Sequence, residues 1–250
     1  MAISRSASLL CAAMLSLGTT AAHAWTATYS GLPVTTYSGT AFTDTNPSNY
    51  IWFGAGYNTA AYQALYAGYS PAPGGYADST APTLTTKTLN YGKITFALKT
   101  AGDYSFSIKT PGSGLYDSPT TYDMQSTLYA AAGSTDPFVP ANIYTNLVAF
   151  NDDTKNTGSA NPYPLHYLKQ DSTTCVMVTL VYTSWSNNAS ALAELTVEGP
   201  TQIAATCTEL TDTTVATPQP VPASQNSTLV LMGMILSAMG AGALYRRRKS

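Results

Sequence analysis

Between residues 25 and 200, apolar side chains recur at every second position in short runs that end at Gly, Pro, Asn or Asp. This alternation is typical of half-buried β-strands. The clearest run covers residues 93–109, where a turn at residues 101–103 separates two alternating segments. The apolar positions of the two segments are Ile94, Phe96 and Leu98, then Tyr104, Phe106 and Ile108. The pattern predicts a β-hairpin with one apolar face.

Further runs of the same kind predict strands along the whole segment, and no apolar stripe of useful length has helical spacing. The predicted strands lie at residues 26–29, 34–37, 126–131, 147–151, 175–184 and 191–198. Their spacing predicts an all-β fold, an antiparallel β-sandwich. The Tyr-, Gly- and Pro-rich segment 57–82 has two interpretations: a long loop that covers the sandwich edge, which we favour, or a ligand groove.

The amino-terminal residues have the pattern of a signal peptide. Arg5 precedes an apolar stretch at residues 9–17, and Ala22 and Ala24 are the small residues that a signal peptidase needs. We therefore expect residues 1–24 to be removed, so that the mature chain begins at Trp25.

The carboxyl-terminal tail, residues 223–250, has the pattern of a membrane anchor. Its uncharged apolar run 229–245 would span roughly 26 Å as a helix, slightly less than a hydrocarbon core of about 30 Å. Arg246, Arg247 and Arg248 follow in the basic cluster 246–249. Because basic clusters stay on the cytoplasmic side, we expect a transmembrane helix with its C-terminus inside and the ectodomain outside.

A short proline motif, Val221 and Pro222, lies before that helix at the end of the linker 201–222, which is Pro-rich from residue 217 onward. Motif, helix and basic cluster together resemble the bacterial PEP-CTERM and IPTL-CTERM sorting signals, although the Leu and the Trp-Gly pair usual in the latter are missing. The resemblance implies a membrane protease that cuts near the motif. It also implies an exported protein of the cell envelope or extracellular space, anchored in the inner membrane transiently or permanently.

The predicted ectodomain, residues 25–200 and the linker, is acidic. It carries 13 acidic residues against six lysines, a net charge of −7, and no arginine. The negative field repels polyanions, and the bidentate arginine fork that recognises phosphate and guanine is absent from it. We therefore expect no nucleic-acid partner.

Two cysteines remain after the signal peptide, Cys175 and Cys207. Export to an oxidising compartment makes a disulfide between them the default expectation, although a buried free thiol at Cys175 also fits a strand. The bridge would tie the segment after Pro200 to the domain.

The order of short motifs between residues 103 and 200 has a second resemblance. Asp123 precedes a Leu-Tyr pair at 128–129, and an Asn-Asp-Asp turn at 151–153 follows the apolar run 147–150. This resembles the bacterial pre-peptidase C-terminal (PPC) domain. The resemblance implies a jelly-roll-like sandwich core at residues 93–200, and a binding or stabilising module instead of a catalytic one.

The acidic turn is the best candidate for chemistry in the chain. Asn151, Asp152 and Asp153 are adjacent oxygen-bearing side chains, and Asp123 would join them from the neighbouring strand if the predicted fold holds. Calcium binds six to eight oxygens of this kind. The turn lacks the alternate spacing of an EF-hand loop, so a calcium site and an Asx turn that caps its own backbone both remain open.

Enzymatic motifs are missing from the sequence. His166 is the single histidine after the signal peptide, and the chain has no Gly-x-Ser-x-Gly, His-Glu-x-x-His or Cys-x-x-Cys motif. Paired carboxylates for glycoside cleavage remain open, because a sequence gives no distances between acids. We expect a non-enzymatic protein.

Two functions fit these observations. The first is an exported cell-surface or extracellular-matrix protein whose partner is a polysaccharide or another surface protein. The alternative is a calcium-dependent carbohydrate-binding or adhesive module, for which Trp52, Tyr57 and Trp185 are the candidate ligand-binding aromatics. The two tryptophans would equally serve as plugs at the ends of the sandwich.

Overall fold

The computed structural model describes residues 23–43, 49–57, 60–78, 84–114, 122–154, 161–185, 187 and 190–210. The predicted signal peptide up to residue 22 and the whole predicted sorting tail, with Val221, Pro222 and residues 229–249, lie outside this part of the chain. Within it, no helix has both the length and the apolar character needed to cross a membrane.

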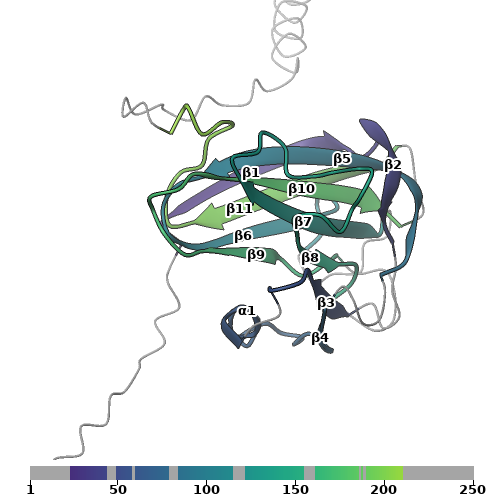
Figure 1. The fold of residues 1–250 in the computed structure, drawn as a ribbon. Coiled ribbons are helices and arrows are strands. Elements are labelled where there is room, and N and C mark those ends of the chain that lie inside the picture. Colours follow the sequence, from purple (N-terminus) through teal and green to yellow (C-terminus); the bar gives the residue numbers. More distant parts are fainter. Residues whose placement is uncertain are drawn as a thin grey trace, which may run out of the picture.

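The described chain is all-β, and its strands form two sheets (Figure 1). The four-stranded sheet has the order β1-β11-β6-β9, with β1 Trp25–Pro33, β11 Leu192–Gly199, β6 Gly102–Lys109 and β9 Leu165–Lys169. The seven-stranded sheet has the order β2-β5-β10-β7-β8-β3-β4, with β2 Tyr37–Phe42, β5 Thr86–Leu98, β10 Val176–Ser184, β7 Met124–Ala132, β8 Leu147–Asn151, β3 Tyr50–Phe53 and β4 Gly75–Asp78. All pairs are antiparallel except β3 with β4.

The main hydrophobic core lies between the two sheets. Strand β11 illustrates how the sequence builds it, because Leu195 and Val197 point inward while Thr196 between them faces outward. Across the core, the ring centroids of Phe96 on β5 and Phe106 on β6 are 5.9 Å apart. The two sheets therefore form a sandwich over one shared apolar layer.

A second core covers the outer face of the seven-stranded sheet. Strand residues such as Phe42, Tyr129 and Phe150 pack there beneath Phe138 and Ile143 from the connection between β7 and β8. Strand β10 is consequently buried along its whole length, on both faces. This explains its nearly continuous apolar sequence, which resembles that of a strand in a two-sided sheet.

The hairpin predicted at residues 93–109 is wrong, although both of its strands exist. Strand β5 belongs to the seven-stranded sheet and β6 to the four-stranded sheet, so the turn at residues 99–101 carries the chain from one sheet to the other. Both strands direct their apolar side chains into the same central core from opposite sides, as the contact between Phe96 and Phe106 shows. Alternation alone does not distinguish this arrangement from a hairpin.

Two other local predictions need correction. The strand predicted at residues 34–37 is wrong because a turn occupies residues 34–36, and β2 starts only at Tyr37. The segment 57–82 contains a short helix, α1 Ala60–Leu65, and strand β4. Figure 1 shows α1 near β3 and β4, the last two strands of the seven-stranded sheet.

The predicted disulfide between Cys175 and Cys207 is confirmed, with its Cα atoms 5.9 Å apart. The segment after β11 returns to the seven-stranded sheet, where the Ala97 amide donates to the Ala204 carbonyl at 2.8 Å. Ile203 packs into the main core beside this contact. The bridge therefore closes a segment that is also held by a backbone bond and an apolar anchor.

Candidate metal centre

The predicted acidic residues meet at one end of the seven-stranded sheet. Because β7 and β8 are antiparallel, with Ser126 opposite Asn151, the start of β7 lies beside the end of β8. On the other side of β7, the Trp185 amide donates to the Asp123 carbonyl at 2.8 Å and continues the ladder with β10. Asp123 is thus held in strand geometry next to the segment that follows Asn151.

Three carboxylates come together at this end. Each of Asp123, Asp152 and Asp153 offers an oxygen, and these oxygens all lie within 4.8 Å of one another. Asp152 and Asp153 are 1% and 2% exposed, so their charges are largely removed from water. Like charges at this spacing repel strongly, and a bound cation would offset the repulsion.

The spread of the oxygens suits calcium. Calcium ligands lie about 2.3 to 2.6 Å from the ion, so two oxygens on one calcium ion are at most about 5 Å apart. The three acids, all within 4.8 Å, could therefore bind one calcium ion without a large change of the backbone.

Asn151 serves chiefly to position this centre. It is fully buried, its side-chain oxygen accepts from the Tyr163 amide at 2.8 Å, and its side-chain nitrogen donates to the Tyr50 carbonyl at 2.8 Å. These two bonds tie the end of β8 to β3 and to the segment before β9. The side chain predicted as a calcium ligand therefore fixes the backbone from which Asp152 and Asp153 project.

Other hydrogen bonds hold the segments on both sides. The Tyr163 hydroxyl lies 3.0 Å from the Thr154 carbonyl, and the Thr110 hydroxyl donates to the Tyr122 carbonyl at 2.7 Å. Asn161, which is fully buried, accepts from the Thr110 amide at 3.0 Å. The residues that flank the acids are thus anchored to the body, which pre-organises the centre.

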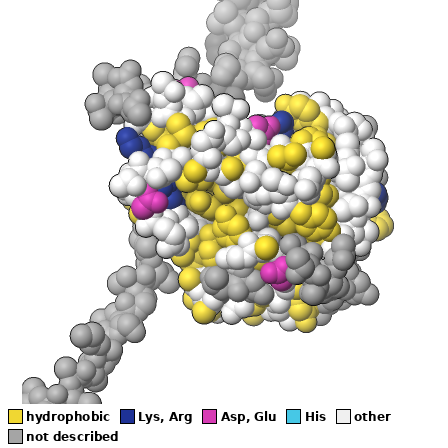
Figure 2. All heavy atoms as spheres, viewed as in Figure 1, with side chains coloured by type: hydrophobic (Ala, Val, Ile, Leu, Met, Phe, Trp, Pro, Cys, Tyr) yellow, Lys and Arg dark blue, Asp and Glu magenta, His cyan; other side chains and the backbone are white. Residues whose placement is uncertain are grey.

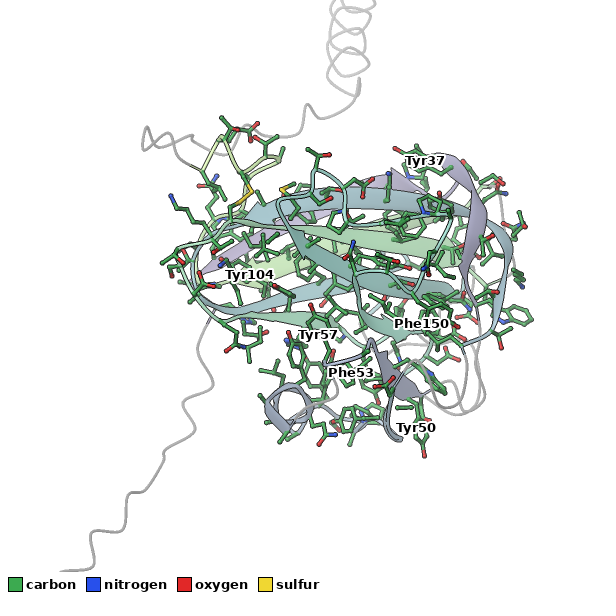
Figure 3. All side chains as sticks on the ribbon, in the orientation of Figure 1. Tyr37, Tyr50, Phe53, Tyr57, Tyr104 and Phe150 are labelled. Carbon is green, nitrogen blue, oxygen red and sulfur yellow. A yellow bond between two sulfur atoms is a disulfide. The ribbon has the colours of Figure 1, made fainter. Side chains whose placement is uncertain are left out.

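The three candidate ligand-binding aromatic residues differ in how far they are exposed to solvent. Trp52 is 2% exposed and packs in the outer core, so the expectation of an accessible ring there is corrected. Tyr57 is half-buried, with its ring 5.6 Å from that of Tyr62, and Figure 3 shows it between α1 and the sandwich. Trp185 is 44% exposed, with the Lys87 ammonium 5.5 Å from its ring centre. Of the three, only Trp185 presents much of its ring to solvent.

A buried network around His166 has no counterpart in the sequence motifs. His166 is 3% exposed, its Nδ1 lies 2.9 Å from an Asp103 oxygen, and its Nε2 lies 2.7 Å from the Tyr69 hydroxyl. Both ring nitrogens therefore have partners, which fits a histidine that fixes the packing of α1 and the following turn onto β9. The three residues are far apart in the sequence, so no local signal predicts the network.

Comparison with protein-family models, with curated proteins and with solved structures finds no match for this chain. Its function must therefore be inferred from the centre itself.

Proposed function

We propose that this chain is an exported, non-enzymatic β-sandwich protein of the cell surface or extracellular matrix, in which a bound calcium ion organises one end of the domain. The observation that carries the proposal is the meeting of three carboxylates, two of them buried, at one end of the seven-stranded sheet. A surface module of this kind would bind an extracellular polysaccharide or another surface protein near the ordered end.

Three observations support the proposal that the protein is exported. Strand β1 starts at Trp25, so removal of residues 1–24 would leave every strand complete. A disulfide between Cys175 and Cys207 suits an oxidising compartment. The sequence of the tail supports sorting by a membrane protease. The likeness to PPC domains, with its jelly-roll-like core, stays a prediction that agrees with a binding role.

The distribution of charge supports a neutral or cationic partner over nucleic acid. The ectodomain has a net charge of −7. On the face seen in Figure 2, charged side chains are few and scattered among polar and apolar ones.

Calcium binding is tested by calorimetric titration and thermal unfolding of the exported protein, with and without EDTA. We expect calcium at a hundred times its dissociation constant to stabilise the fold by about 2.7 kcal/mol. Asp152→Asn and Asp153→Asn should each remove most of this stabilisation, because each deletes a charged ligand. Glu198→Gln, a change on a half-buried acid of the four-stranded sheet, is the control and should leave this stabilisation intact. A wild-type protein whose melting temperature is the same with added calcium and with EDTA would contradict the proposal.

A second candidate function, calcium-dependent carbohydrate binding, is favoured by Trp185. Its exposed ring directly follows β10, and its amide is bonded to Asp123, one of the three acids. An exposed indole stacks on the apolar face of a sugar ring, and an ordered strand end would hold it in place.

A further inference from the structure

Gln125 is an unusual residue for the middle of a sheet. It lies in β7, its side chain is fully buried, and neither its amide nitrogen nor its amide oxygen has a hydrogen-bond partner among the described residues. Buried carboxamides in folded proteins are nearly always hydrogen-bonded, because burying one without a partner costs free energy.

The register of the sheet directs Gln125 toward the acids. Side chains two residues apart on a strand share a face, so Gln125 lies on the same side of β7 as Asp123. Tyr129, also on that side, packs in the outer core, whereas Met124 and Leu128 face the core between the sheets. One step beyond the pair Ser126 and Asn151, the same register places Gln125 beside Asp152.

Thr154 has the same property in the adjoining segment. It follows Asp153 directly, is 1% exposed, and its hydroxyl oxygen has no hydrogen-bond partner in the described chain. Its carbonyl faces the Tyr163 hydroxyl at 3.0 Å, so the backbone is fixed while the side-chain oxygen stays available.

We infer that the side-chain oxygens of Gln125 and Thr154 are two further ligands of the ion at Asp123, Asp152 and Asp153, and that the ion is calcium. This inference rests on the proposed function. It brings the side-chain oxygens of the centre to five or more, since a carboxylate can bind through one oxygen or both. Calcium takes six to eight oxygens, amide and hydroxyl oxygens among them, whereas magnesium keeps several of its waters.

A buried water molecule is the rival explanation for two unmet polar groups. The two explanations differ in their consequence for calcium. If Gln125 only binds a water molecule, removing its amide leaves the calcium affinity unchanged. If Gln125 is a calcium ligand, removing its amide lowers the calcium affinity.

The test compares Gln125→Met, which keeps the length of the side chain and removes its polar atoms, with the wild type. In EDTA, we expect the melting temperature of the variant to equal or exceed that of the wild type, because a buried polar group without a partner is removed. In calcium, we expect the affinity measured by calorimetry to fall about tenfold to a hundredfold, with a smaller calcium-induced rise in melting temperature. Thr154→Val, which keeps the shape of the side chain, should act in the same direction.

The chain offers a matched control at the neighbouring position. The Ser126 hydroxyl is also buried without a hydrogen-bond partner in the described residues, but strand alternation turns it toward the other face of β7. Ser126→Ala should therefore bind calcium like the wild type. Magnesium should bind the wild type more weakly than calcium.

The outcomes separate the two proposals. A wild-type protein that binds no calcium contradicts the proposed function. If the wild type binds calcium, and Gln125→Met and Thr154→Val bind it as tightly as Ser126→Ala does, the present inference is overturned and the proposed function stands. If Gln125→Met does not fold, Thr154→Val alone decides between these outcomes.

Discussion

At the scale of single residues, burial decides which polar and aromatic side chains are available for binding. Trp52 and Trp185 both have polar neighbours in the sequence, yet Trp52 is 2% exposed and Trp185 is 44% exposed. Trp52 is enclosed because it shares the outer face of the sheet with Phe150, its pairing partner on β8. Figure 3 shows Phe150 at the end of the sheet close to β3.

This difference in burial predicts different effects of the same substitution at Trp52 and at Trp185. Trp52→Ala should lower the free energy of unfolding by about 3 to 5 kcal/mol, because it leaves a large cavity in the outer core. Trp185→Ala should change it by no more than about 0.5 kcal/mol, as is usual at exposed positions, and should abolish glycan binding. Urea unfolding and a pull-down with envelope polysaccharide measure the two effects. Glycan binding that survives Trp185→Ala would remove the carbohydrate proposal.

At the scale of elements, α1 and the turn after it replace a missing strand at the edge of the four-stranded sheet. The amide of Leu168 donates to the Tyr62 hydroxyl at 3.1 Å, and the amide of His166 donates to the Tyr66 hydroxyl at 3.3 Å. Four residues of a helix rise about 6 Å and two residues of a strand about 6.6 Å, so the spacings match. The edge of β9 is thereby closed to pairing with another chain.

The buried tyrosines make this edge sensitive to alkaline pH. Burial raises the pKa of Tyr62, and it raises the pKa of Tyr66 well above 10. The pKa of each hydroxyl is higher in the folded protein than in the unfolded chain. The contribution of the neutral hydroxyls to the free energy of unfolding is therefore complete below about pH 10 and is lost as the pH rises further. Tyr62→Phe and Tyr66→Phe should each cost about 1 to 3 kcal/mol near neutral pH, since a backbone amide loses its acceptor.

Urea unfolding between pH 7 and 11 checks this prediction. The wild type should lose more stability above pH 10 than either variant does. Tyr37→Phe, at an exposed ring stacked on Tyr91, is the control and should follow the wild type. Equal alkaline losses in Tyr62→Phe and the wild type would contradict the explanation.

At the scale of the whole molecule, the described domain is bounded by the two predicted processing sites. Its first strand begins at Trp25, and its last backbone contact with the sheet is at Ala204, close to Cys207. The prediction is a mature N-terminus at Trp25 and a C-terminus near Val221, found by mass spectrometry of the envelope and released fractions from the native host. The intact tail in the envelope fraction would instead indicate a domain that stays tethered to the inner membrane.

The sequence by itself determined several of the strands and the acidic candidates. Short apolar runs, alternating or continuous, placed β7, β8, β10 and β11 within one or two residues of their bounds. A strand with one buried face leaves a period of two in the sequence, and a strand with two buried faces leaves a continuous apolar run. The order of the motifs also brought Asp123 and the acids at 152–153 to the same predicted site. The disulfide followed from Cys175 and Cys207, the two cysteines outside the predicted signal peptide.

Only the tertiary structure decided which faces and which distant segments meet. It assigned β5 and β6 to different sheets, buried Trp52 in the outer core, and buried the polar side chain of Gln125 in β7. It also joined His166 to Asp103 and Tyr69. The apolar pattern of a strand indicates which of its side chains are buried, but not which distant segment covers them. Sheet membership and the ligand set depend on contacts between strands far apart in the chain, and these leave no local period to read.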